Sequence, residues 1–146
     1  IGHLQRNKVK HNAPFVSLIH SVDSIRLLEE INKRAKENKR IINCLIQVYI
    51  AQEKSKSGFK IDSVEEVINA CYHFKYIRII GIMGMASLTS NKNQINSEFL
   101  SLKKIFDVIK NKNIKVLSMG MSNDYQIAID NDSNLIRIGS KIFNNE

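Results

Sequence analysis

Two short segments combine serine, glycine and arginine in patterns that could hold a phosphate group. They read SMGMS at residues 118–122 and RIGS at residues 137–140. In the first, glycine relieves a tight strand-to-helix turn and Ser122 opens the helix, so that free backbone N–H groups and a hydroxyl point to one place. In the second, Gly139 lets the backbone approach a ligand while Arg137 offers a charged fork. Together they predict an anion site.

Each segment also has an ordinary structural interpretation. Turn glycines and serine helix caps are common in the loops that join strands to helices, and either segment alone carries little weight. The two segments follow the last two predicted strands of the chain, however, and barrel enzymes often hold phosphate with the loops after their last two strands. The hypothesis therefore depends on the two segments meeting in space.

The elements that must position these segments alternate between short apolar runs and helical apolar stripes. Ser122 is the expected N-cap of the last helix. The alternation predicts an α/β fold with a parallel sheet, either doubly wound or part of a closed barrel. Strands are predicted at residues 15–19, 41–50, 77–82, 114–117 and 135–138, and apolar positions at helical spacing mark helices within 24–38, 62–71, 95–109 and 122–130.

Length and composition favour one intracellular domain over residues 1–146. With 43% apolar residues the chain can bury a useful core. It has no apolar run of about 18 residues and begins with a polar, basic stretch, so we expect neither a membrane span nor a signal peptide, and a cytoplasmic location. Cys44 and Cys71 are isolated from each other and from the histidines, which predicts neither a disulfide framework nor a metal site. No histidine is assigned catalysis, and His20, at a strand end, is the one to test.

A formal net charge of +8 raises the alternative of a nucleic-acid-binding fragment. Lysines greatly outnumber arginines, and the densest basic run, Asn32–Arg40, suits the solvated end of a helix. The sequence has no aromatic platforms of the kind that stack on bases. We expect no nucleic-acid partner.

Six segments resemble, in order, the signatures of the pyridoxal phosphate homeostasis proteins, small relatives of the alanine racemase N-terminal barrel. They span nearly the whole chain. The segments are IGHLQRNK (1–8), HSVDS (20–24), LIQVYIAQEKSKSGF (45–59), GIMGM (81–85), LSMGMSNDYQIAI (117–129) and LIRIGSKIF (135–143).

This resemblance implies the C-terminal five βα units of a (β/α)₈ barrel that binds pyridoxal 5′-phosphate. An arginine facing the pyridine nitrogen would keep it unprotonated and weaken the cofactor as an electron sink. A methionine on the third strand would line the ring or simply fill the core. The implied cofactor-binding residues are Ser122, Gly139 and Ser140 for the phosphate, Arg137 for the pyridine nitrogen, and Met83 and Ser118.

The sequence departs from the family pattern in its first units. The family's cofactor lysine lies at the end of its first strand in an AVSK-like segment that these 146 residues lack, and the five strands would correspond to strands four to eight. Lys56 is the best substitute, although it is better explained as a solvated loop residue. A partial barrel exposes edges and apolar surface, so we expect marginal stability and pairing with an N-terminal half or with itself.

The expected function is non-catalytic binding of pyridoxal 5′-phosphate in intracellular homeostasis of the cofactor. No catalytic residue is assigned. The alternatives are a racemase-like enzyme and the nucleic-acid-binding fragment. Racemase chemistry needs the lysine plus an acid or base on each side of the cofactor, so the missing lysine disfavours the enzyme.

Overall fold

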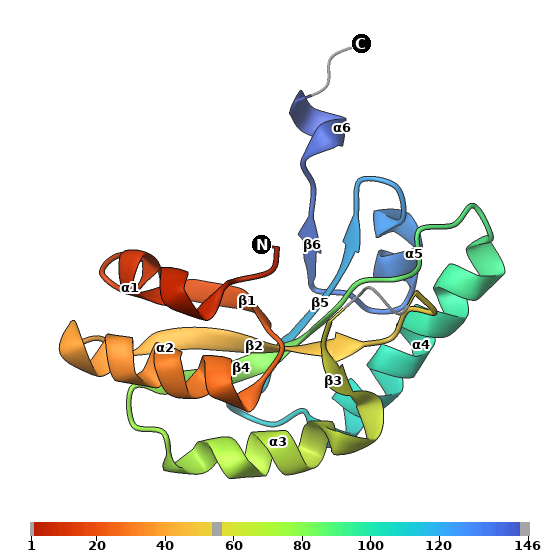
Figure 1. Ribbon diagram of the computed structural model, residues 1–146. Helices are drawn as coiled ribbons and strands as arrows, with labels where there is room; N and C mark the ends of the chain where they lie inside the picture. Colours follow the sequence, from red (N-terminus) through yellow and green to blue (C-terminus); the bar gives the residue numbers. More distant parts are fainter. Residues whose placement is uncertain (1, 54–56, 144–146) are drawn as a thin grey trace.

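The chain forms a curled, fully parallel sheet that resembles part of a barrel wall (Figure 1). The structure is a computed structural model that describes residues 2–53 and 57–143. The strand order is β1-β2-β4-β5-β6, and the two-residue β3 pairs with β2. The strands are β1 (Leu18–Val22), β2 (Ile42–Tyr49), β3 (Phe59–Lys60), β4 (Ile77–Gly84), β5 (Val116–Met121) and β6 (Leu135–Arg137).

The helices that lie between strands cover the outer face of the sheet, whereas the short helix after β6 extends beyond the end of that strand (Figure 1). The longest, α4, starts at a true cap, because the Asn91 side chain accepts hydrogen bonds from the backbone N–H groups of Asn93 and Gln94. Among the described residues no helix is long and apolar enough to cross a membrane. The helices are α1 (Val9–Asn12), α2 (Ile25–Glu37), α3 (Val64–Ala70), α4 (Lys92–Ile109), α5 (Tyr125–Asp130) and α6 (Ser140–Phe143).

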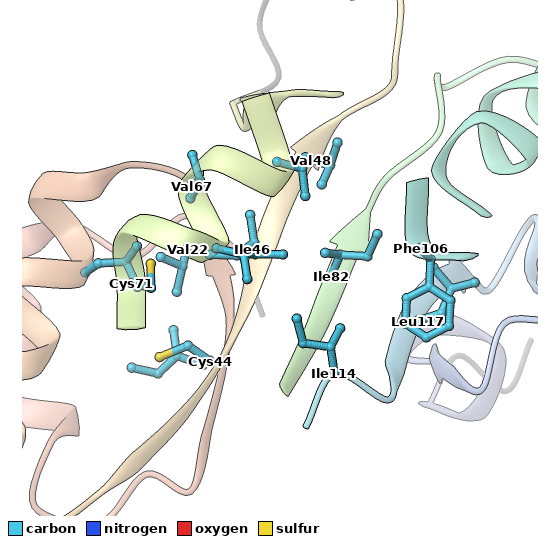
Figure 2. Close-up of a cluster of buried hydrophobic side chains, with 14 of the residues drawn as sticks. Val22, Cys44, Ile46, Val48, Val67, Cys71, Ile82, Phe106, Ile114 and Leu117 are labelled. Carbon is cyan, nitrogen blue, oxygen red and sulfur yellow. The ribbon is translucent and has the colours of Figure 1, made fainter. Parts of the chain in front are cut away.

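The hydrophobic core lies between the sheet and these helices (Figure 2). Side chains alternate along a strand, so Ile46 and Val48 of β2 point outward to the helical layer, where Val67 of α3 joins them. Phe99 of α4 is fully buried in the same core. Burial of this apolar stripe is what binds the helices to the sheet.

The opposite, concave face carries a row of side chains from adjacent strands. Gln47 pairs with Met83 and Met83 with Ser118 in the parallel register, and all three are buried. Their immediate neighbours Ile46, Ile82 and Leu117 belong to the outer core, so alternation turns this row inward. The row leads from β2 across the sheet toward β6.

The predicted five parallel strands with helices between them are confirmed, with corrections at three boundaries. The first strand is Leu18–Val22 rather than 15–19, because Phe15 belongs to a turn in which its N–H bonds to Asn12 O. The fourth main strand, β5, begins two residues later than predicted and runs on to Met121. The last predicted helix begins at Tyr125, with Asp124 rather than Ser122 at the N-cap position.

Candidate functional site

The carboxyl ends of β4, β5 and β6 surround a cavity of about 470 Å³. In parallel α/β sheets the loops at this end of the strands are where ligands bind. A hollow of about 520 Å³ lies at the amino ends of β4 and β5, and none of the predicted site residues lines it. The residues around the first cavity are Ala86, Ser87, Leu88, Thr89, Ile95, Met121, Ser122, Asn123, Asp124, Arg137, Ile138, Gly139 and Ser140.

The first predicted segment meets the residues that follow β6 at the Ser122 hydroxyl. Ser122 Oγ accepts hydrogen bonds from the backbone N–H groups of Gly139 and Lys141, each at 3.3 Å. Both bonds are long, and the Ser122 hydroxyl still has its own proton to donate. The Ser122 hydroxyl can therefore donate to an anion oxygen, and the two N–H groups can do so where the anion replaces Ser122 Oγ as their acceptor.

Gly139 leaves the backbone open to the cavity. A Cβ atom built on Gly139 would have nothing within 4 Å, although the residue lines the cavity wall. A larger side chain at this position would project into free space rather than into the protein. The glycine therefore removes bulk at the point where a ligand would meet the backbone.

The Ser122 hydroxyl and the N–H groups of Gly139 and Lys141 are here called the cradle. Arg137 is a buried cation that lines the same cavity. Only 7% of its surface is exposed; its Nη1 donates to Ser118 Oγ at 2.7 Å and its Nη2 to Gly84 O at 3.1 Å. Burial lowers the pKa of Arg137, an effect that the Asp124 carboxylate partly opposes. Its Nε atom is buried with no hydrogen-bond partner among the described residues. Such a donor marks the side chain as one able to bind a further acceptor.

The turn after β5 owes its shape to Gly120 and Asp124. Gly120 has φ +96°, and an added Cβ would lie 2.6 Å from Ala128 Cβ. Asp124 Oδ1 accepts the Met121 N–H at 2.6 Å and closes the turn. Because the helix does not begin until Tyr125, this turn leaves Ser122 free to face β6 instead of capping α5.

The structure brings four of the six predicted residues together at the cavity. Ser122, Arg137, Gly139 and Ser140 all line it. Met83 and Ser118 do not line it: both are fully buried, and Ser118 accepts the hydrogen bond from Arg137. Lys56 lies outside the described residues.

His20 also comes within electrostatic reach of Arg137. It lies on β1, half-buried, and its Nδ1 is a buried atom with no hydrogen-bond partner in the part of the chain that the structure describes. Burial, and to a smaller extent the charge of Arg137, lower the pKa of His20. The imidazole is therefore kept neutral near pH 7.

The loop after β4, which lines the same cavity, was not predicted from the sequence. Ala86, Ser87, Leu88 and Thr89 contribute to the cavity wall. Ser87 and Thr89 follow the third predicted strand, and the carboxyl ends of parallel strands share one edge of the sheet. These two hydroxyl residues could therefore have been predicted to line the site. Lys141 was not predicted either; its N–H donates to Ser122 Oγ, and its Nζ lies 3.2 Å from Tyr125 Oη.

A family model, curated proteins and solved structures all match nearly the whole chain. Residues 3–145 match the family model described as the N-terminal domain of alanine racemase. A pyridoxal phosphate homeostasis protein of Helicobacter pylori is 39% identical over 98% of this chain and 64% of its own length. The chain thus spans a little under two thirds of the length of the curated relatives it matches.

Solved structures agree on the fold. A protein from Bifidobacterium adolescentis superimposes with a TM-score of 0.92 at 32% identity, over 98% of this chain and 59% of that one. PipY of Synechococcus elongatus, whose structure has pyridoxal phosphate bound, gives a TM-score of 0.85 at 24% identity, over 98% of this chain and 68% of PipY.

Proposed function

Because the chain belongs to the alanine racemase N-terminal domain family, and within it to the pyridoxal phosphate homeostasis proteins, we propose that it binds pyridoxal 5′-phosphate and acts in cytoplasmic handling of that cofactor without turning over a substrate. One observation carries the proposal. The N–H groups of Gly139 and Lys141 meet the Ser122 hydroxyl at the wall of a cavity that Ser122, Gly139 and the buried Arg137 line.

The cradle fits a phosphate group. Phosphate oxygens accept several hydrogen bonds at once, and backbone N–H groups with a serine hydroxyl are a common way to hold them. Ser140 would add a second hydroxyl, since it lines the cavity and is exposed. The open space in front of Gly139 gives a phosphate room to reach the backbone.

Arg137 fits the remaining half of the cofactor. When bound, pyridoxal phosphate supplies a ring that can withdraw electrons from an attached carbon centre, most strongly when its pyridine nitrogen is protonated. The partnerless Nε of Arg137 offers a donor for that nitrogen. An arginine in this role does not give up its proton readily, so it favours the unprotonated ring and a carrier over a catalyst.

The titratable groups at the cavity also favour binding without catalysis. Of the described residues that line it, only Asp124 and Arg137 carry titratable side chains, and both are engaged: Asp124 with the Met121 N–H, and Arg137 with Ser118 and Gly84. A racemase-like reaction requires a proton donor or acceptor on each side of the cofactor. This cavity wall offers no such pair.

Equilibrium dialysis against pyridoxal phosphate tests the proposal, because it detects binding with or without a covalent bond. We expect saturable binding by the wild-type chain and a loss of roughly 100-fold or more in affinity for Ser122→Ala with Arg137→Ala, since each charge-assisted hydrogen bond contributes ~1.5–3 kcal/mol. Treatment with borohydride before dialysis reports separately whether any lysine attaches.

Ser97→Ala with Arg26→Ala is the matched control. Both residues are exposed, lie on helices α4 and α2, and do not line the cavity. The control should bind as the wild type does. Equal affinity in both double variants, with both folded by circular dichroism, would contradict the proposed site; no binding by a folded wild-type chain would contradict the proposed function.

A further inference from the structure

Glu98 is a buried carboxylate directly behind the cavity wall. It lies in the second turn of α4 with 7% of its surface exposed. Its oxygens accept three hydrogen bonds: from Ser87 N–H at 2.6 Å, from Ser87 Oγ at 2.7 Å and from Gln94 Nε2 at 3.1 Å. A carboxylate is buried at a high desolvation cost unless its oxygens are satisfied in this way.

Ser87 also forms a hydrogen bond with a second loop. Its hydroxyl oxygen also accepts the Gln52 N–H at 2.9 Å, so the loop after β2 is joined to the loop after β4. A second bond, from Leu88 N–H to Glu53 Oε1 at 2.6 Å, links the same two loops. Glu98, Ser87 and Gln52 thus form a continuous hydrogen-bonded chain, here called the Glu98 clasp.

The clasp also decides what Ser87 can offer a ligand. A serine hydroxyl has one proton, and that of Ser87 is donated to Glu98. Its backbone N–H is donated to Glu98 as well. Both donors of Ser87 are therefore engaged in short bonds to a carboxylate, whereas the Gly139 and Lys141 N–H groups make only 3.3 Å bonds to the neutral Ser122 hydroxyl and can exchange that acceptor for an anion.

We propose that Glu98 is a positioning residue which, through Ser87, holds residues 85–89 as a preformed cavity wall in the free protein. Residues 86–89 line the same cavity as Ser122 and Gly139, so their position affects how much room a ligand has there. A preformed wall spares the ligand the entropy of ordering a loop when it binds. The part of the inference that concerns ligand affinity rests on the proposed function; the part that concerns the free protein does not.

Hydrogen exchange of the free protein tests the wall directly. In Glu98→Gln the Ser87 hydroxyl and Gln94 lose an anionic acceptor at almost unchanged volume. We expect the amides of Ser87 and Leu88 to exchange about tenfold faster or more, because hydrogen bonds to charged groups are the stronger ones. The amides of β2 and of the α4 centre should exchange as in the wild type, which separates local opening from global unfolding.

Affinity for pyridoxal phosphate provides the second readout. Glu98→Gln should weaken binding about tenfold, and Ser87→Ala should do the same although it removes no charge. Glu66→Gln on the exposed face of α3 is the matched control for loss of a carboxylate and should change neither readout.

The outcomes separate this inference from the proposed function. Unchanged exchange at Ser87 and Leu88 in a folded Glu98→Gln chain overturns the positioning role, whatever the ligand does. Faster exchange with unchanged pyridoxal phosphate affinity overturns the link to the cavity. If the wild-type chain binds no pyridoxal phosphate, the proposed function fails, and the exchange result alone then decides whether Glu98 holds the wall.

Discussion

Replacing Gly139 by alanine should separate ligand binding from stability. The structure places nothing within 4 Å of the added Cβ, and the φ angle of Gly139 lies outside the left-handed region, so the folded chain can accept the methyl group. The free energy of unfolding should stay the same or rise by up to ~1 kcal/mol, because alanine restricts the unfolded chain. The methyl group would instead occupy the space that a phosphate needs beside the Gly139 N–H. Overpacking typically costs about 1–3 kcal/mol, which corresponds to a loss of roughly 5-fold to 150-fold in affinity for pyridoxal phosphate.

The measurement pairs urea unfolding with equilibrium dialysis, and Gly120→Ala is the comparison variant. At Gly120 the backbone is left-handed, and the new Cβ would lie 2.6 Å from Ala128 Cβ and 2.9 Å from Tyr125 Cα. Conformational strain and overpacking together should cost about 2–5 kcal/mol of stability. Gly139→Ala that binds pyridoxal phosphate as tightly as the wild type would refute the argument that the ligand approaches the backbone there. A destabilised Gly139→Ala would show that the space around it is not free.

Two further predictions follow from the ionisable groups. Burial raises the pKa of Cys71 to about 11 and also raises the pKa of Cys44. Neither thiol should therefore react with iodoacetamide at about pH 8 in the folded chain, while both should react in urea. Rapid labelling without denaturant would contradict their burial. The pKa of His20 is lowered in the folded state, mainly by burial, so the unfolded chain binds more protons and stability should fall as the pH drops below the ordinary histidine value of 6.5. When the pH is lowered from about 7.5 to 5.5, the urea midpoint should therefore fall less in His20→Asn than in the wild type. An equal fall in both chains would contradict the assignment of this pH dependence to His20.

The sequence predicted the fold well because hydrophobic periodicity reports burial. The apolar stripe of Ile95, Phe99, Leu102 and Phe106 identifies α4, and all four residues are buried. The continuous apolar stretch at residues 41–50 identifies β2, which is buried on both faces. In such central elements the spacing of apolar residues along the sequence is set by burial in the core, so it can be read without knowing distant partners.

The prediction failed where polar residues are buried by partners distant in sequence. Ser118 and Gly120 look like the start of a loop, yet β5 continues through them because Ser118 is satisfied by Arg137, which lies on the next strand. Ser122 looks like a helix cap, yet its oxygen accepts N–H groups from the segment after β6. The Glu98 clasp is invisible for the same reason, since its members come from three different segments.

The strand order bears on how the chain acquires its site during synthesis. Apart from the short β3, each strand of the sheet lies beside the strand that precedes it in the chain. Folding can therefore proceed vectorially, with each new βα unit docking onto an edge that is already formed, and no strand needs to wait for a distant partner. The cradle depends on β5 and β6, which follow β4 and α4 in the chain. Among the described segments, the wall held by Glu98 lies earlier in the chain than β5 and β6, so it would be in place before the two strands that carry Ser122 and Arg137 dock beside it.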